Sequence, residues 1–101
     1  MKFNIDHQYN YSVVAKEYFD KTYGNSYFSA RIFNSEGVCI ATLPLQYGYG
    51  DMYLYTAREV ISKWYDNPEA VINCRFSKLF LDYYKTDNCK QRDVKNFVFD
   101  I

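Results

Sequence analysis

Glycine, tyrosine and aspartate gather in residues 46–53, Gln-Tyr-Gly-Tyr-Gly-Asp-Met-Tyr, just before the longest helical pattern of the chain. Free amides at the start of a helix bind anions, so this loop is a candidate phosphate site. However, neither of the phosphate-binding fingerprints, G-x-G-x-x-G and G-x-x-x-x-G-K-S/T, is present. Asp51 also places a carboxylate where a phosphate would lie. The sequence therefore favours a structural aromatic loop over a nucleotide site.

Side chains suited to catalysis or metal binding do not form a recognisable set. His7 is the single histidine and lies near a terminus, which makes it a poor candidate for a positioned general base. A zinc site would need Cys39, Cys74 and Cys89 to converge with His7, although the chain has no C-x-x-C spacing. We interpret the cysteines as reduced, buried or half-buried thiols. We expect neither an enzyme nor a cofactor or metal.

Tyrosine dominates the composition, with twelve Tyr and eight Phe among 101 residues. An AT-rich genome would account for this composition as well as function would. Tyrosine buries its ring while its hydroxyl stays in water, which suits contact surfaces, and Tyr and Arg are enriched at interface hot spots. On this basis the candidate binding residues are Arg31, Tyr47, Tyr49, Asp51 and Tyr53.

The charge distribution argues against binding to the phosphate backbone of a nucleic acid. The formal net charge is zero, and residues 1–50 hold four basic and four acidic side chains, with eight of each in the rest. The basic residues near the C-terminus, including Lys90 and Arg92, alternate with aspartates and are typical of a solvated face. Three aromatic residues with a central arginine, Tyr27, Phe28, Phe33 and Arg31, still suggest a stacking platform for single strands. Nucleic-acid or nucleotide binding is therefore the alternative function.

Residue periodicity predicts one α+β domain over residues 1–101, with an antiparallel sheet packed on a main helix and a short second helix. The helix spans 51–65, with Asp51 as N-cap. Its apolar face is Leu54, Ala57, Ile61 and Trp64. Strands are predicted at residues 11–19, 27–34, 38–43 and 79–85.

Several boundaries carry specific expectations. Residues 11–19 favour a strand, although a helix stays open there. Pro44 is expected to end the pairing of the third strand, because it has no amide proton to donate. Asn67 and Pro68 start a second helix that we extend to about residue 77. The last apolar run, residues 97–99, is either a short strand or a docked tail.

Two segments resemble a family of small proteins encoded by bacteriophages and prophages. They are Tyr-Gly-Asn-Ser-Tyr-Phe-Ser-Ala-Arg at 23–31 and Leu-Gln-Tyr-Gly-Tyr-Gly-Asp-Met-Tyr at 45–53. They are similar to the family's G-N-[ST]-Y-x-S-[AV]-R strand and to its Q-Y-G-Y-G-[DE]-x-Y loop, which opens a helix. The similarity covers roughly residues 20–60 and is faint beyond Trp64. The family's tail is basic, whereas this chain ends in an apolar run, and no catalytic residue is carried over.

The resemblance implies a phage or mobile-element accessory protein in the cytoplasm of a bacterial host. Small accessory proteins without catalytic motifs commonly bind host proteins, including defence complexes. The expected function is thus a non-enzymatic inhibitor of a host protein, with a CRISPR-type complex as the candidate target. No signal peptide is predicted, and no apolar run reaches the ~18 residues of a membrane span. The sequence does not indicate an oligomeric state.

Overall fold

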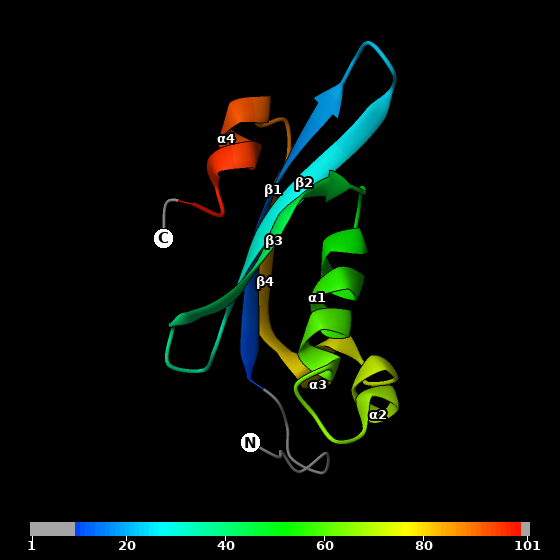
Figure 1. Ribbon diagram of the computed structural model, residues 1–101, viewed down its shortest axis with the longest axis vertical. Coiled ribbons are helices and arrows are strands. Elements are labelled where there is room, and N and C mark those ends of the chain that lie inside the picture. Colours follow the sequence, from blue (N-terminus) through cyan, green and yellow to red (C-terminus); the bar gives the residue numbers. More distant parts are fainter. Residues whose placement is uncertain (1–9, 100–101) are drawn as a thin grey trace.

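Four strands form one sheet in the order β3-β2-β1-β4, in a computed structural model that describes residues 10–99. The strands are β1 (Tyr11–Asp20), β2 (Asn25–Phe33), β3 (Cys39–Tyr47) and β4 (Phe80–Thr86). The helices are α1 (Met52–Ser62), α2 (Pro68–Ile72), α3 (Phe76–Leu79) and α4 (Gln91–Asn96). Figure 1 shows α1 and α4 on opposite faces of the sheet. The predicted α+β class is confirmed.

The β1–β2 hairpin follows directly from the alternation of its residues. Val13 and Ala15 of β1 lie beside Ile32 and Ala30 of β2, and all four are fully buried under α1. Gly24 closes the turn in a left-handed conformation (φ 71°), which glycine adopts without a steric penalty. Residues 11–19 are therefore part of a strand, and the helix that the sequence left open does not form.

Strand β3 continues through Pro44 to Tyr47, so the prediction that this proline ends the pairing is wrong. Leu43 pairs with Ala30 and Gln46 with Phe28, so two residues of β3 lie opposite a single residue of β2. Proline is tolerated at such an irregularity and on an edge strand, because no ladder bond needs its missing amide proton. Both conditions hold here, since β3 is the outermost strand on its side.

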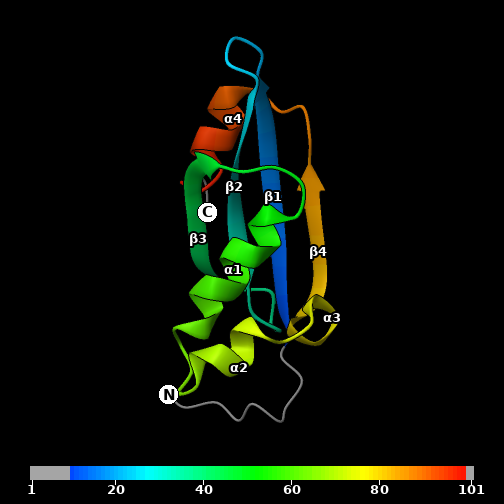
Figure 2. The same ribbon diagram turned by 90° about the vertical axis from the view of Figure 1, so that its right-hand side faces the viewer.

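Strand β4 runs parallel to β1, whereas the sequence predicted an antiparallel sheet. The chain leaves β3, passes through α1, α2 and α3, and returns to the end of the sheet where β1 begins (Figure 2). Parallel strands of one sheet are joined by a crossover connection, which is usually helical. A tight hairpin turn can join only antiparallel strands. The three helical segments therefore decide the direction of β4.

Helix α1 buries Leu54, Ala57 and Ile61 against the sheet, as predicted. It ends at Ser62 rather than near residue 65, so Trp64 lies beyond the helix and is half-buried. Asp51 lies at the N-cap position, where its backbone carbonyl accepts from the amide of Leu54 at 2.9 Å. Its carboxylate makes no capping bond, so that part of the prediction is wrong. The backbone of Asp51 (φ −89°, ψ 8°) lacks the extended conformation that aims an N-cap side chain at the first turn.

Helix α2 starts as predicted, since the Asn67 side chain accepts from the amide of Ala70 and Pro68 occupies the first turn. It ends at Ile72 rather than near residue 77. Arg75 is extended (φ −68°, ψ 148°) and separates α2 from the short α3. The start of α2 is set by neighbouring residues, Asn67 and Pro68, and can be predicted from the sequence. Its end depends on the path that the chain takes to β4.

Candidate functional site

Four tyrosine side chains cross one end of the sheet, and we name Tyr18, Tyr27, Tyr47 and Tyr49 the tyrosine row. Tyr27 lies opposite both Tyr18 on β1 and Tyr47 on β3, so one side chain comes from each of three neighbouring strands. The ring centroids of successive members lie 5.3, 6.1 and 6.5 Å apart. Tyr47 and Tyr49 are 54% and 60% exposed. The row is thus a continuous, half-exposed aromatic strip.

The register of the sheet puts this row on the face that carries α4. Successive side chains of a strand point to opposite faces, so Tyr27 shares a face with Ser29 and Arg31. Ser29 donates its hydroxyl hydrogen bond to the Val94 carbonyl of α4, and the Nε of Arg31 donates to the Phe97 carbonyl at 2.8 Å. The tyrosine row therefore borders the docked C-terminal helix.

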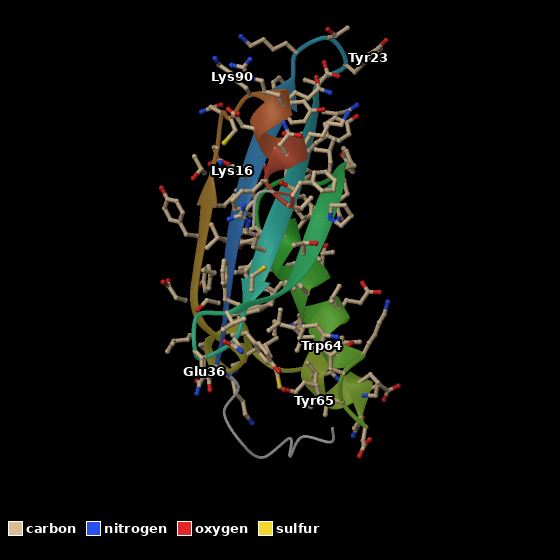
Figure 3. All side chains as sticks on the ribbon, turned by 60° about the vertical axis from the view of Figure 1, so that its left-hand side comes forward. Lys16, Tyr23, Glu36, Trp64, Tyr65 and Lys90 are labelled. Atoms are coloured by element: carbon tan, nitrogen blue, oxygen red, sulfur yellow. The ribbon has the colours of Figure 1, made fainter. Side chains whose placement is uncertain are left out.

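An open hollow adjoins the Tyr18 end of the row. Its lining consists of Tyr18, Phe19, Asp20, Lys21, Cys89, Lys90 and Gln91. Lys21 and Lys90 are exposed, and neither forms an ion pair with any of residues 10–99. Figure 3 shows Lys90 and the hairpin residue Tyr23 at the same end of the molecule. The lining of the hollow thus includes two aromatic side chains, two ammonium groups and the carboxylate of Asp20.

Gly48 holds the loop at the other end of the row against the sheet. It is buried, and its amide donates to the Ser26 carbonyl at 3.0 Å. A Cβ at this position would lie 2.5 Å from Cε1 of Phe28, whose side chain is 1% exposed. Only glycine lets the backbone between Tyr47 and Tyr49 approach the Phe28 ring this closely.

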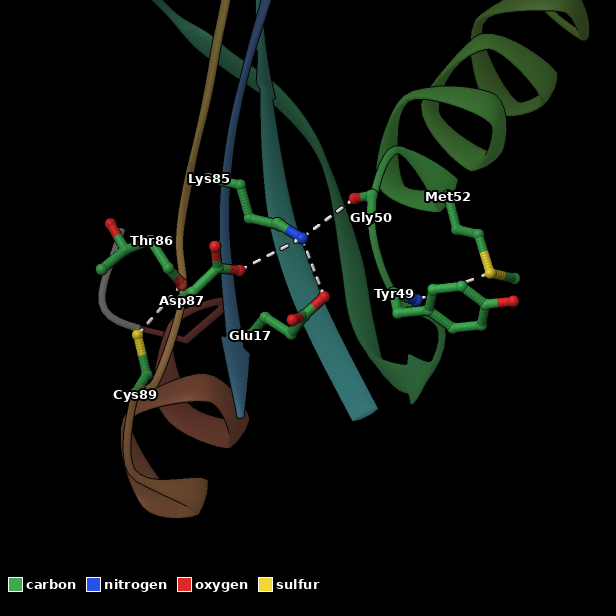
Figure 4. A network of polar contacts seen from close by, with 8 residues as sticks. All are labelled: Glu17, Tyr49, Gly50, Met52, Lys85, Thr86, Asp87 and Cys89. Carbon is green, nitrogen blue, oxygen red and sulfur yellow. Dashed lines mark hydrogen bonds and ion pairs between the residues drawn. The ribbon is translucent and has the colours of Figure 1, made fainter. Parts of the chain in front are cut away.

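Lys85 fixes the same loop from the β4 side. Its Nζ lies 3.0 Å from the Gly50 carbonyl, 2.9 Å from Oε1 of Glu17 and 3.2 Å from Oδ1 of Asp87 (Figure 4). The Lys85 and Glu17 side chains are both mostly buried, so solvent screens this ion pair less than a surface pair. The loop that carries Tyr49 is therefore held by a backbone hydrogen bond and by a lysine.

The five residues selected from the sequence do not form one surface. Tyr47 and Tyr49 are exposed members of the row, and Asp51 is exposed at the start of α1. Tyr53 is 4% exposed and belongs to the core. Arg31 is half-buried beneath the C-terminal segment, with its guanidinium carbon 4.2 Å from the centroid of the Phe97 ring.

Tyr18 is the surface residue that the sequence prediction missed, and Tyr27 enters that prediction only through the suggested stacking platform. The turn at Gly24 and Asn25 joins β1 to β2, and its geometry determines which residues of the two strands face each other. Counting outward from that turn pairs Tyr18 with Tyr27. The signal was therefore present, but the third strand joins the row only through the irregular β2–β3 register.

Helix α4 was not predicted, because residues 90–96 were interpreted as a charged, solvated segment. Val94 is fully buried and Phe97 is 8% exposed, so these two side chains, three apart, anchor the segment on the sheet. The Phe97 ring also lies 4.8 Å from Nζ of Lys16. Of the two alternatives for residues 97–99, the structure thus shows the docked tail, with Phe99 exposed.

No family model, curated protein or solved structure matches this chain. The resemblance of residues 20–60 to phage proteins therefore stays a prediction.

The described residues offer little for metal or thiol chemistry. Within residues 10–99 no group of three or more His, Cys, Asp or Glu side chains could hold a metal ion. Cys39, Cys74 and Cys89 are free, half-buried thiols, each near a backbone carbonyl. His7 lies outside the described range. Across the same range no helix is long and apolar enough to span a bilayer.

Two ionisable groups under the loop have raised pKa values. Burial, followed by the negative charges of Asp51, Tyr83 and Asp87, raises the pKa of Tyr53 from 10.0 to about 12. Burial opposes the charge of Lys85, but its hydrogen bonds to Glu17 and Asp87 outweigh burial and raise the pKa of the ammonium. Both groups therefore keep their protons to higher pH in the folded chain than in the unfolded chain.

We expect the free energy of unfolding to fall as the pH rises from 10 to about 12. In this range the unfolded chain releases the Tyr53 proton while the folded chain retains it, so alkali favours unfolding. The measurement is the urea midpoint as a function of pH. Tyr53→Phe removes the phenol, so its profile should be flatter over the same interval. An unchanged slope in that variant would show that Tyr53 is not responsible.

Proposed function

We propose that this chain is a non-enzymatic protein-binding module whose contact surface is the tyrosine row. The observation that carries the proposal is the row itself: four tyrosines from three strands and a loop, of which Tyr47 and Tyr49 are more than half exposed. Tyrosine gives a large contact area with few rotatable bonds and one hydroxyl for hydrogen bonding. An uninterrupted strip of it is typical of an interface hot spot.

The partner that we propose is a protein of a bacterial host, bound in its cytoplasm. The similarity of residues 23–31 and 45–53 to phage-encoded proteins supports this setting. Inhibition of a host defence complex of the CRISPR type is the specific form of the proposal. In this form the chain acts by occupying a surface of its target, and no residue needs a catalytic role.

The ring geometry supports a protein partner rather than a nucleic acid. Tyr18 and Tyr27 stack on each other with an interplanar angle of 19°, and Tyr27 meets Tyr47 edge to face. Bases stack on free ring faces, which these contacts partly occupy.

Nucleic-acid binding stays the second candidate because of the hollow next to Tyr18. Lys21 and Lys90 lie there beside an aromatic ring, and neither lysine is neutralised by an ion pair within residues 10–99. Phosphate contacts weaken steeply as salt is added, whereas a tyrosine-anchored interface does not. Retention of a partner at ~0.5 M salt, where exposed-charge contacts are largely screened, separates the two functions.

The test is affinity capture from host lysate with the tagged chain and with two variants, Tyr49→Ala and Tyr55→Ala. We expect the wild type to retain one host protein through high salt and nuclease, and Tyr49→Ala to weaken its binding by at least ~30-fold, the effect of losing a ~2 kcal/mol hot spot. Tyr55 is similarly exposed (57%) but lies on α1, so it is the matched control. Melting temperatures of both variants should stay near that of the wild type.

Three outcomes would contradict the proposal. Capture that disappears with nuclease or with salt would assign the surface to nucleic acid. A large loss of melting temperature in Tyr49→Ala would show that the ring supports the fold rather than a partner. Equal loss of binding in Tyr49→Ala and Tyr55→Ala would show that the contact surface is not confined to the row.

A further inference from the structure

The two edges of the sheet are built differently. The outer strand β3 contains Pro44, and its pairing with β2 is irregular at two places. Proline and irregular pairing are devices by which proteins prevent further strands from adding to an edge. The opposite edge, β4, has seven residues and no proline, and its pairing with β1 is irregular only at its first step. Of the two edge strands described, only β3 thus contains a proline, and its pairing is the more irregular.

The free edge of β4 also carries exposed apolar side chains. Leu81, Tyr83 and Tyr84 are 66%, 48% and 64% exposed. Figure 2 shows β4 at the rim of the sheet, and no described strand lies beyond it. An exposed, apolar edge strand is a template for another strand, because its outward amides and carbonyls lack partners in a sheet.

We propose that β4 pairs with β4 of a second copy of this chain, antiparallel about a two-fold axis at Tyr83. Tyr83 is the midpoint of Phe80–Thr86, so this register alone places all seven residues of each strand opposite one another. A two-fold interface joins the same patch of both copies and needs a self-complementary strand. The zero net charge of the chain adds no overall repulsion between copies.

Complementarity between cross-strand neighbours supports this register. Asp82 and Tyr84 pair with Ser12 and Val14 of β1, so both side chains point to the face that carries α4. With Tyr83 on the axis, Tyr84 lies opposite Asp82 of the second copy, and a phenol meets a carboxylate twice. A register centred on Asp82 would instead set two carboxylates against each other, which is unfavourable.

The proposal predicts a dimer, measured by sedimentation velocity or light scattering across a dilution series. Tyr84→Glu places a carboxylate opposite Asp82 at both symmetric positions, and we expect it to raise the dissociation constant about tenfold or more. Combining Tyr84→Glu with Asp82→Lys replaces that repulsion by two ion pairs and should restore the dimer. Tyr23→Glu is the matched control, because Tyr23 is 77% exposed in the β1–β2 turn, away from β4.

The outcomes are distinct from those that test partner binding, because β4 does not contribute to the tyrosine row. A monomer at every concentration would overturn the proposal, as would a dimer that Tyr84→Glu leaves intact or that the double variant fails to restore. If circular dichroism shows that Tyr84→Glu does not fold, Leu81→Lys provides a second test. It places lysine opposite Lys85 of the second copy and should also give a monomer.

Discussion

Replacing Phe97 with alanine lowers the free energy of unfolding by about 3 kcal/mol, the lower end of the range for a buried phenylalanine. Its side chain is 8% exposed and lies between Lys16 and Arg31, within cation–π distance of both. Removing the ring leaves two half-buried cations without this contact and weakens the attachment of α4 to the sheet. For a domain of this size the melting temperature should fall by roughly 12–20 °C. Urea unfolding and calorimetry measure both quantities.

Phe99 provides the matched control for this experiment. It is two residues further along the chain and 75% exposed, so Phe99→Ala should change stability by less than ~0.5 kcal/mol. Similar losses in the two variants would show that docking of Phe97 does not contribute specifically. A normal melting temperature in Phe97→Ala would mean that Val94 and the hydrogen bond from Ser29 hold α4 without the ring.

Replacing Gly48 with alanine lowers the free energy of unfolding by about 2–3 kcal/mol, towards the upper end of the usual range for overpacking. The added Cβ would lie 2.5 Å from Cε1 and 2.8 Å from Cδ1 of Phe28, and 3.3 Å from Cβ of Met52. Phe28 is packed in the core at 1% exposure, so its ring cannot swing away cheaply. Either the ring or the loop must move.

Two further variants show whether the clash is the cause. Phe28→Leu removes the ring atoms with which the new Cβ clashes. The double variant with Gly48→Ala should therefore lose less free energy of unfolding than the sum of the losses in the two single variants. Gly50→Asn is the control, because Gly50 is left-handed (φ 59°) with open space around its Cα, and asparagine tolerates that conformation. Strictly additive losses at positions 28 and 48 would contradict the account.

Gly48→Ala also tests whether the packing of the loop on the core positions the tyrosines of the candidate interface. Gly48 lies between Tyr47 and Tyr49, so a loop pushed off Phe28 would carry both exposed rings out of the row. We therefore expect Gly48→Ala to weaken partner binding as well as stability. Phe97→Ala is expected to affect stability more than it affects binding, because Phe97 contacts Lys16 and Arg31 rather than the tyrosines.

Local signals in the sequence predicted the elements whose cause is local. The β1–β2 hairpin follows from alternation around a Gly-Asn turn, and α1 follows from apolar residues three and four apart. The start of α2 follows from Asn67 and Pro68. Tyr47 and Tyr49, two of the binding candidates, are exposed at the end of β3 and in the loop after it, although the sequence favoured a structural loop there.

Long-range packing decided the remainder, since no local pattern encodes it. The parallel direction of β4 depends on the end of the sheet to which α1, α2 and α3 lead the chain. Helix α4 depends on the packing of Val94 and Phe97 against the sheet. Arg31 and Tyr53 are of residue types that are common at interfaces, but residues distant in sequence cover them. Phe97 packs over Arg31, and Nζ of Lys85 lies 5.9 Å from the centroid of the Tyr53 ring.

By itself, the sequence determined an α+β chain with a tyrosine-rich hairpin, a glycine-dependent loop and an amphipathic main helix. Each of these depends on periodicity or on backbone preferences within about ten residues. Only the tertiary structure aligned Tyr18, Tyr27 and Tyr47 into one row and placed β4 at the outer edge of the described sheet. Both features depend on strand register and strand order, which are set by contacts between residues far apart along the chain.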